Sequence, residues 1–297
     1  SDESLKKILG ISNQEDKSKA YLGLIRNFKR LFWFVLLEFG NSALVDKTFV
    51  SRRKNDLEEL NASDLFQKDA TSLRMSDIGY QSQAQKNLDF KYNDLASFLD
   101  ELKKGIIMPH PEFQKLGLQD ENGKYQQISD GILQIENELY DCIRPKRAGK
   151  SGQRPYQLLK DQGIQYVEVR GIDLNPNSLV GITEDQIRVL DLLLIYCLIN
   201  ESPKMTDKEK LIIEKTDIST IKFGRNSSST VSYKNSEMPI IEARNYLIND
   251  LMLLANEMGD EQYVKAINSL KVRKNILNQD RSFHEAGLEI AKNNSIK

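Results

Sequence analysis

The feature that most constrains this fold is a strongly apolar segment between Thr183 and about Asn200, in which only Arg188 and Asp191 interrupt the apolar residues after Gln186. Thr183 and Gln186 stand three residues apart at its start, in the capping-box pattern that marks a helix N-terminus. A helix over this run is apolar on most of its faces, so we expect it to be buried beneath other elements. Its longest uninterrupted stretch, Leu192–Ile199, falls well short of the roughly 20 residues that a bilayer requires. The sequence therefore predicts a buried helix and no membrane span.

Further helices are predicted from apolar residues that recur at helical spacing. One runs from about Ser18 to Phe39, with Gly40 placed to cap its C-terminus. Another covers Asn93–Lys104, with Gly105 as its stop. The other predicted segments are a polar loop at 55–64, a Ser/Asn-rich loop at 225–232 and C-terminal helices at about 237–257, 261–277 and 281–293.

The near-zero net charge of the chain limits the kinds of molecule that it is expected to bind. The chain has 297 residues, of which 42 are Lys or Arg and 43 are Asp or Glu, giving a net charge of -1. A nucleic-acid-binding protein usually carries a basic excess, so we expect no nucleic-acid partner. Any anionic ligand must be bound by local arginines.

Cysteine and histidine are too sparse for a disulfide framework or a histidine-rich metal site. Cys142 and Cys197 form no CxxC pair, and the only histidines are His110 and His284. We therefore expect a cytoplasmic protein in a reducing environment, and carboxylate ligands for any metal, as magnesium prefers. The chain opens on Ser1 without a methionine or a signal peptide, from which we expect a fragment boundary.

Two strands are predicted, Gly131–Tyr140 and Ile164–Asp173, separated by a basic loop at Arg144–Arg154. Residues two apart on a strand share a face, so each strand is expected to have one charged face and one apolar face. The side chains expected on the charged faces are Glu136, Glu138 and Tyr140 on the first strand and Tyr166, Glu168 and Arg170 on the second, with Arg144, Lys146 and Arg147 between them.

Two interpretations of this charged surface remain open. It can be an ordinary solvated sheet face. It can also be the floor of an active site, where carboxylates hold a divalent cation and arginines bind phosphate or carboxylate groups. The spacing alone does not decide between them.

A second cluster lies in Thr71–Tyr80, where Arg74 and Tyr80 offer guanidinium and phenol donors suited to a small carboxylate. The alternative is a structural ion pair beside a tyrosine at a turn. Other motifs fail: Gly149–Ser151 resembles the end of a P-loop but lacks its first glycine, and Cys142 has no nearby histidine to activate it.

Three stretches resemble bacterial glutamate–cysteine ligase of the proteobacterial type. They are Thr-Ser-Leu-Arg-Met-Ser-Asp-Ile-Gly-Tyr at 71–80, Leu-Gln-Ile-Glu-Asn-Glu-Leu-Tyr at 133–140 with Ile-Arg-Pro-Lys-Arg at 143–147, and Tyr-Val-Glu-Val-Arg at 166–170 with Ile-Asp-Leu-Asn-Pro at 172–176. Their order and spacing also match the family, and the similarity fades in the C-terminal helices.

The resemblance implies an α+β fold related to glutamine synthetase and the guanidino kinases, with an antiparallel sheet walled by helices. It implies one partial ligase domain over residues 1–297, with its sheet at about 65–182 and its helical parts at about 15–40 and 183–297. The implied reaction joins the side-chain carboxylate of L-glutamate to L-cysteine through an acyl phosphate. It consumes ATP, requires Mg²⁺ and is the first step of glutathione biosynthesis.

The resemblance also implies roles for individual residues. Glu168 is expected to bind magnesium, and Arg170 to stabilise the transferring phosphoryl group. Arg74, Tyr80 and Tyr140 are expected to hold the carboxylate of the incoming cysteine. Contacts to the nucleotide are expected from Glu136, Asn137, Arg144, Lys146 and Arg147.

This chain departs from the family pattern in two ways. Asp141 and Cys142 stand where relatives often have a small residue and a proline. The first part of the family, which supplies most of the magnesium-binding glutamates, has no counterpart before Ser1, so we expect the chain alone to be inactive. Two alternatives remain: another carboxylate–amine ligase of the same superfamily, or a non-catalytic module that binds an amino acid.

Overall fold

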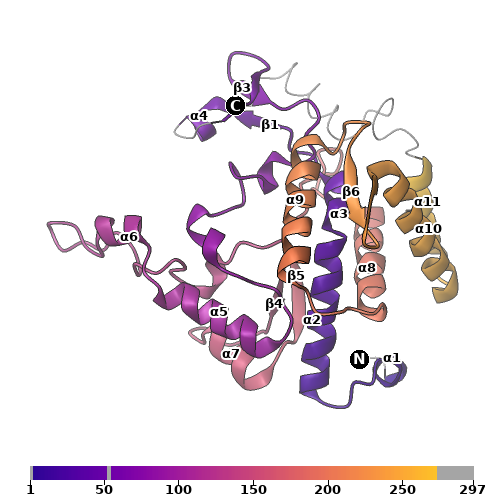
Figure 1. The fold of residues 1–297 in the computed structure, drawn as a ribbon, viewed down its shortest axis with the longest axis horizontal. Coiled ribbons are helices and arrows are strands. Elements are labelled where there is room, and N and C mark those ends of the chain that lie inside the picture. Colours follow the sequence, from indigo (N-terminus) through magenta and orange to yellow (C-terminus); the bar gives the residue numbers. More distant parts are fainter. Residues whose placement is uncertain (1–2, 52–54, 273–297) are drawn as a thin grey trace. The chain divides into compact units, whose positions relative to one another are not determined.

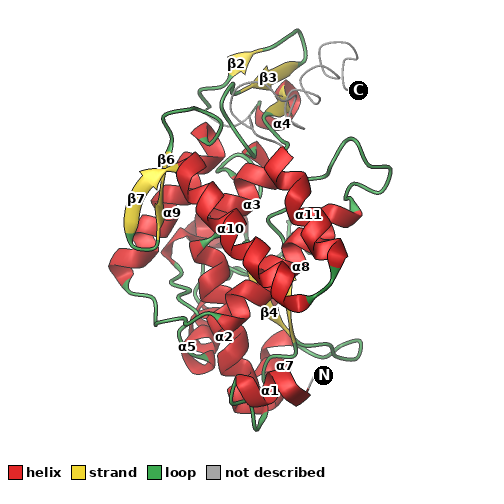
Figure 2. Cartoon of the chain, turned by 90° about the vertical axis from the view of Figure 1, so that its right-hand side faces the viewer, coloured by secondary structure: helices red, strands yellow, loops and turns green. Residues whose placement is uncertain are grey.

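The computed structural model describes residues 3–51 and 55–272. The helix predicted at 281–293, with His284, and the end of the helix predicted at 261–277 lie outside these residues. Helices dominate the described chain and are joined by small antiparallel sheets, which confirms the α+β class (Figures 1 and 2). Within the described ranges, every helix falls short of the length and apolar character that crossing a membrane needs.

Helices and short strands alternate along the described chain. The helices are α1 Glu3–Ile8, α2 Gln14–Arg30, α3 Phe32–Phe39, α4 Lys47–Val50, α5 Leu95–Ile107, α6 Pro111–Leu116, α7 Pro155–Gln162, α8 Glu184–Ile199, α9 Asp207–Phe223, α10 Ile240–Met258 and α11 Glu261–Val272. The strands are β1 Leu44–Asp46, β2 Glu58–Glu59, β3 Asp64–Phe66, β4 Ile143–Lys146, β5 Tyr166–Val169, β6 Thr230–Tyr233 and β7 Ser236–Pro239. Short 3-10 turns cover Leu73–Met75, Gln83–Asn87 and Glu136–Glu138.

The described residues divide into two compact units. Unit 1 consists of residues 3–27, 82–170 and 198–206, and unit 2 of residues 28–51, 55–81, 171–197 and 207–272. The single partial domain predicted from the sequence, with its ranges 15–40, 65–182 and 183–297, stays a prediction.

In unit 1, α5 packs against α7, and α6 lies on an arm that follows the end of α5 (Figure 1). The prediction that Gly105 stops α5 is wrong, because the helix continues to Ile107. A Cβ atom at Gly105 would lie 2.8 Å from Leu133 Cδ1 and 3.0 Å from Leu88 Cδ1. The glycine therefore allows buried leucines to approach the helix backbone instead of ending the helix.

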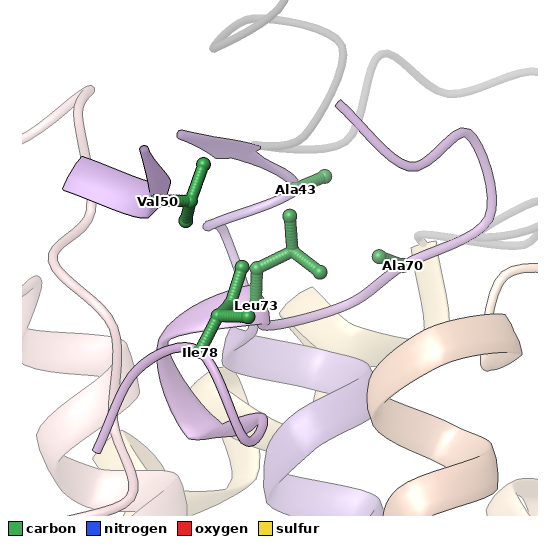
Figure 3. Packing of buried hydrophobic residues seen from close by; sticks show 5 residues of the cluster. All are labelled: Ala43, Val50, Ala70, Leu73 and Ile78. Carbon is green, nitrogen blue, oxygen red and sulfur yellow. The ribbon is translucent and has the colours of Figure 1, made fainter. Parts of the chain in front are cut away.

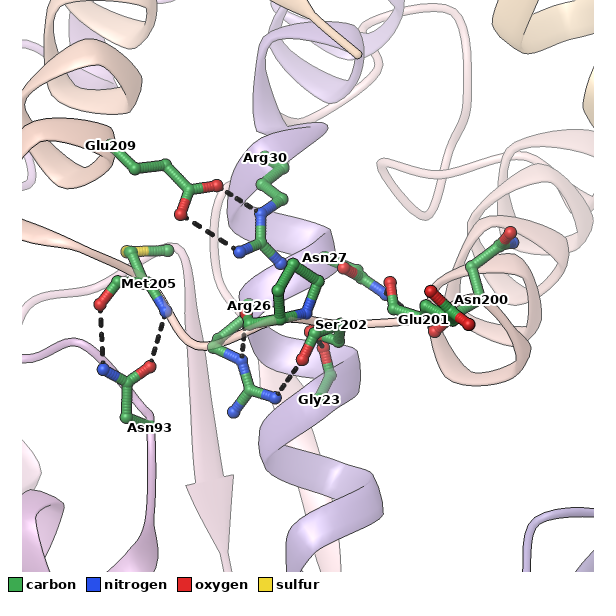
Figure 4. Close-up of polar contacts among 11 residues, drawn as sticks. Gly23, Arg26, Asn27, Arg30, Asn93, Asn200, Glu201, Ser202, Met205 and Glu209 are labelled. Atoms are coloured by element: carbon green, nitrogen blue, oxygen red, sulfur yellow. Dashed lines mark hydrogen bonds and ion pairs between the residues drawn. The ribbon is translucent and has the colours of Figure 1, made fainter. Parts of the chain in front are cut away.

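Residues 198–206 are held to the rest of unit 1 by hydrogen bonds between side chains and their backbone (Figure 4). Arg26 donates to the carbonyl oxygens of Ser202 (2.7 Å) and Pro203 (3.2 Å). The side chain of Asn93 pairs with the backbone of Met205 in both directions, at 2.9 and 2.7 Å. These bonds satisfy backbone groups of residues 200–206, which follow the end of α8 and form no helix or strand.

The first predicted strand, Gly131–Tyr140, is wrong. Its backbone groups bind elsewhere: the Leu133 N–H donates to the Gly105 carbonyl, and the Gln134 N–H donates to the Glu138 carboxylate at 2.7 Å. The residues beyond form a 3-10 turn, so Glu136, Glu138 and Tyr140 do not share a strand face.

The strand partner is β4, in the stretch predicted to be a basic loop. It pairs antiparallel with β5, which confirms the second predicted strand over a shorter range. The register places Arg144 opposite Glu168 and Pro145 opposite Val167. The Arg170 N–H bonds to the Cys142 carbonyl, so Cys142 and Arg170 form a hydrogen-bonded pair. Such pairs alternate with non-hydrogen-bonded pairs along an antiparallel ladder, which makes Pro145 and Val167 a non-hydrogen-bonded pair. A residue without an N–H is tolerated at this position.

In unit 2 the helix predicted at 18–39 is interrupted. Leu31 has φ -109° and ψ 5°, which separates α2 from α3. Gly40 does follow the last turn of α3, as predicted, and its N–H donates to the Leu36 carbonyl. Its φ of -67° is not left-handed. Gly40 is needed for space, because a Cβ there would lie only 2.6 Å from the Thr71 carbonyl oxygen.

The apolar run after Thr183 is α8, and its capping box is confirmed. The Gln186 N–H donates to Thr183 Oγ1 at 3.2 Å, and the Thr183 N–H donates to Gln186 Oε1 at 2.9 Å. Leu192 and Leu193 are fully buried. The Tyr196 hydroxyl donates to Asp250 on α10 at 3.0 Å. The buried residues recur at helical spacing, while Ile187 is 52% exposed, so α8 is buried along one side and not on most of its faces as expected.

Two further features of unit 2 were not predicted. One is the β6–β7 hairpin, whose turn at Lys234 and Asn235 has positive φ values of 48° and 62°. The other is the sheet β1–β3–β2, which occupies part of the predicted polar loop. Beside it, a small apolar cluster forms a core (Figure 3), made of Ala43, Val50, Ala70, Leu73 and Ile78.

Candidate active site

The centre of the candidate site in unit 1 is the Arg144–Glu168 pair on β4 and β5. Arg144 Nη2 lies 2.7 Å from Glu168 Oε2, and Arg144 Nε donates to the same oxygen at 3.2 Å. The other side of the guanidinium donates to the carbonyl oxygens of Asn137 and Leu139, both at 2.8 Å. Arg144 is buried, so this arrangement fixes both the sheet and the 3-10 turn beside it.

Two more cations surround the Glu168 carboxylate. Arg170 Nε lies 3.3 Å from Oε1, and Lys146 Nζ lies 3.8 Å from Oε2. Burial opposes ionisation of Glu168, but the Arg144 hydrogen bonds and the charges of Arg144, Arg170 and Lys146 outweigh it and lower the pKa of this carboxyl. Burial, together with the neighbouring arginines, lowers the pKa of Lys146. The face carries one carboxylate among three cations, a balance that suits an anionic ligand.

The remaining residues predicted to contact a nucleotide take part in structural contacts around this face. Asn137 Oδ1 accepts a hydrogen bond from Lys146 Nζ at 3.0 Å. Glu136 is buried and lies 3.0 Å from Arg154 Nε. Arg147 donates to the side chain and carbonyl of Gln162 at the end of α7. Asn137 and Lys146 thus join the Glu168 face, whereas Glu136 and Arg147 bind neighbouring segments; their roles toward a nucleotide stay predictions.

In unit 2 the structure brings Arg74 and Tyr80 together. The Arg74 guanidinium carbon lies 5.9 Å from the centre of the Tyr80 ring. Arg74 Nε also lies 2.7 Å from Asp173 Oδ1, and Nη2 donates to the Ile172 carbonyl at 2.9 Å. Both interpretations of this cluster therefore have support, because the arginine forms an ion pair and also approaches the tyrosine.

The third residue predicted to hold the cysteine carboxylate, Tyr140, belongs to unit 1. Its N–H donates to Gln85 Oε1 at 3.0 Å, while Gln85 Nε2 donates to the Glu138 carbonyl at 2.7 Å. The residue is 43% exposed. The grouping of Tyr140 with Arg74 and Tyr80 stays a prediction.

A family model described as glutamate-cysteine ligase matches residues 3–219 of this chain. The chain belongs to the glutamate–cysteine ligase family. Every site residue predicted from the sequence lies inside the matched range.

Curated relatives agree with this assignment. The chain is 38% identical over 266 residues to the glutamate–cysteine ligase of Pseudomonas putida, covering 88% of this chain and 50% of that protein. It is 43% identical over 212 residues to the enzyme of Hahella chejuensis, covering 71% of this chain and 40% of that protein. The chain thus spans about half the length of the relatives that it matches.

Solved structures give the same picture of the fold. The glutamate–cysteine ligase of Francisella tularensis in complex with AMP is 27% identical, with a TM-score of 0.83 over 98% of this chain and 59% of that chain. A bifunctional glutathione synthetase from Pasteurella multocida is 14% identical, with a TM-score of 0.65, which shows likeness of fold alone.

The side chains that the structure describes do not form a complete metal site. Among the described residues there is no group of three or more His, Cys, Asp or Glu placed to hold a metal ion. Glu168 presents a single carboxylate, and Arg144 occupies one of its oxygens through two hydrogen bonds. A divalent cation bound at Glu168 needs further oxygen ligands from elsewhere.

Two residues beside the predicted ligase site were missed as contributors. Asp173 was the last residue of the predicted strand and lay in the Ile-Asp-Leu-Asn-Pro motif. Its pairing with Arg74 was not predicted, because the two residues lie far apart in sequence. Gln85 had no sequence signal. Cys142, the residue before β4, is a buried free cysteine.

Proposed function

We propose that this chain is one part of a glutamate–cysteine ligase that joins L-glutamate to L-cysteine with ATP. In this reaction the γ-phosphoryl group of ATP passes to the side-chain carboxylate of glutamate and ADP leaves. The cysteine amine then attacks the acyl carbon, phosphate leaves with the bonding electrons, and the amine loses a proton. The observation that carries the proposal is the Glu168 face, because it places Arg170 and Glu168 side by side within a family of ligases.

Arg170 is the proposed catalytic residue. A transferring phosphoryl group carries its charge on several oxygens, and the planar guanidinium of arginine can donate to two of them. Glu168 lies 3.3 Å from Arg170 Nε and is itself held by Arg144, so the position of Arg170 depends on a buried anchor. Arg144 then acts through Glu168 as a positioning residue.

Glu168 is also proposed to provide one oxygen to a bound magnesium ion. When bound, magnesium would neutralise charge on the phosphates during transfer. The other ligands would come from parts of the ligase outside the described residues, as the relatives' greater length permits. Asn137 and Lys146 are the side chains best placed on the same face to contact the phosphates, with Glu136, Arg144 and Arg147 supporting them.

Cysteine is proposed to bind through its carboxylate to Arg74, Tyr80 and Tyr140. Arg74 provides the guanidinium donors, and the two tyrosines provide hydroxyl donors that can orient the same carboxylate. The arginine and Tyr80 are already in contact. By holding the carboxylate, this group would orient the cysteine amine for attack on the acyl phosphate.

The test is ADP release by the complete ligase, which we expect to depend on both glutamate and cysteine. Competition with other amino acids separates a cysteine-specific enzyme from another carboxylate–amine ligase. The isolated chain is expected to release no ADP, because its described residues lack a complete metal site. ADP release from the isolated chain would contradict that expectation. The coding sequence upstream of Ser1 shows whether further glutamates are encoded there.

A second candidate function is a module that binds an amino acid without catalysis. It is favoured because the described residues contain no group of three or more side chains placed to hold a metal ion. Calorimetry distinguishes the two. Cysteine binding by the isolated chain that is unchanged by magnesium, together with an upstream stop codon, supports the module.

A further inference from the structure

Arg74 is held in place by an acidic residue that the proposed chemistry does not use. Asp173 Oδ1 accepts a hydrogen bond from Arg74 Nε at 2.7 Å. Asp173 Oδ2 accepts from Ser42 Oγ at 2.7 Å and from the Asn41 N–H at 2.8 Å. Both carboxylate oxygens of Asp173 therefore have donors, and its orientation is fixed from two sides.

The backbone around Arg74 is fixed by the same elements. Ser42 Oγ, which donates to Asp173, also accepts the Arg74 N–H at 3.1 Å. The Leu73 N–H donates to the Ser42 carbonyl at 2.5 Å. After the turn, the Tyr80 N–H returns to the Arg74 carbonyl, which brings the Tyr80 ring toward the guanidinium.

The exposure of its arginine distinguishes this ion pair from the buried Glu38–Arg244 pair of the same unit. Glu38 and Arg244 are both buried, with side chains 0% and 5% exposed, so that pair is shielded from a ligand in solvent. In the Arg74–Asp173 pair the carboxylate is 2% exposed, whereas the arginine side chain is 36% exposed. A buried anion thus orients a cation at the surface, which is the arrangement that a site for a carboxylate ligand needs.

We propose that Asp173 is a positioning residue that sets the guanidinium plane of Arg74 for the carboxylate of the incoming amino acid. This inference rests on the proposed function and adds to it the residue that determines recognition of the substrate carboxylate. Ser42 supports Asp173 in this role. Two parallel N–H···O bonds form only when guanidinium and carboxylate lie in one plane, so a rotated Arg74 binds the substrate less tightly.

The experiment compares cysteine with cysteamine, which has the same amine and thiol but no carboxylate, in the complete ligase. For Asp173→Asn we expect the KM for cysteine to rise about tenfold, the scale of one charge-assisted hydrogen bond. The KM for glutamate and the kcat/KM for cysteamine should stay within about twofold of the wild-type values, a margin well inside that tenfold effect. The matched control is Glu209→Gln, which weakens the Arg30–Glu209 pair of the same unit (2.6 Å; Figure 4) and should leave all three unchanged.

Ser42→Ala is the second variant, since it removes one donor to Asp173 and leaves its charge in place. It should raise the KM for cysteine in the same direction by about threefold, as expected for one neutral hydrogen bond. Equal losses with cysteine and cysteamine would mean that Asp173 only supports the fold. An unchanged KM for cysteine in both variants would also overturn the inference, and if Asp173→Asn does not fold, Ser42→Ala decides alone. A wild-type enzyme that makes no γ-glutamylcysteine would instead overturn the proposed function.

Discussion

Arg144 and Glu168 face each other across β4 and β5, with Nη2 and Oε2 only 2.7 Å apart, although the arginine is buried and the glutamate is not. The arginine also holds two backbone carbonyl oxygens of the turn at 136–139. One guanidinium therefore links three stretches that are separate in sequence, and it sets the place of the carboxylate that neighbours Arg170.

Replacing Arg144 by Met should destabilise unit 1. The change leaves two carbonyl oxygens without their donor and the Glu168 carboxylate without its main partner. We expect the free energy of unfolding to fall by about 2–4 kcal/mol, discounted for the partial exposure of Glu168. Urea unfolding of this chain measures it. Arg188→Met, at an exposed pair with Glu184 on α8, is the control and should change the value by less than about 0.5 kcal/mol.

Replacing Arg170 by Lys in the complete ligase should lower kcat on the order of a hundredfold, because an ammonium group cannot reproduce the guanidinium fork. The KM for cysteine should change little, since Arg170 is not among the residues proposed to bind it. Steady-state measurement of ADP release tests this. Arg188→Lys serves as the matched control, and an unaltered kcat in Arg170→Lys would remove this residue from the mechanism.

The lowered pKa of Glu168 gives a pH dependence with a definite sign. The unfolded chain binds the proton more tightly than the folded chain, so ionised Glu168 stabilises the fold above the ordinary glutamate pKa of about 4.3. This contribution is lost as the pH falls from there through the lower pKa of the folded state. The urea midpoint of wild type should therefore drop more than that of Glu168→Gln between about pH 5 and pH 3. Parallel drops in the two proteins would contradict the prediction.

Gly40 and Gly23 should respond in opposite ways to alanine. At Gly40 a Cβ meets backbone oxygens of Leu36 and Thr71, which cannot move without disturbing α3, so we expect a loss of roughly 2–4 kcal/mol. At Gly23, inside α2, the nearest atom is the Ser202 Cβ at 3.4 Å. Alanine fits there and should add up to about 1 kcal/mol through helix propensity. Thermal unfolding of the two variants makes the comparison, and equal effects would show that the space at Gly40 is not limiting.

Short sequence patterns correctly predicted the helices and strands that are determined by residues close together in the chain. The capping box of Thr183 and Gln186 closes within one helical turn, so its residues alone determine it. The alternation around Glu168 marks β5 for a similar reason. By contrast, the sequence of β4 resembles a loop, because it contains a proline and has three basic residues in and beside it. This segment is a strand because it pairs with β5, which its own sequence does not indicate.

The site shows the same division. Glu168 and Arg170 were expected on one face, and the structure places them in contact. The alternation at 131–140 suggested a strand, yet its polar groups bind within the segment and to α5. The link from Arg74 to Asp173 spans residues far apart along the chain, so no short pattern announces it.

The two units are interleaved along the chain, which changes unit at 27/28, 81/82, 170/171, 197/198 and 206/207. The first of these changes falls inside α2 and the fourth inside α8, so two helices contribute residues to both units. A single cut or a shortened gene cannot release either unit intact. Limited proteolysis should consequently yield no stable single-unit fragment, and thermal melting should follow one cooperative transition.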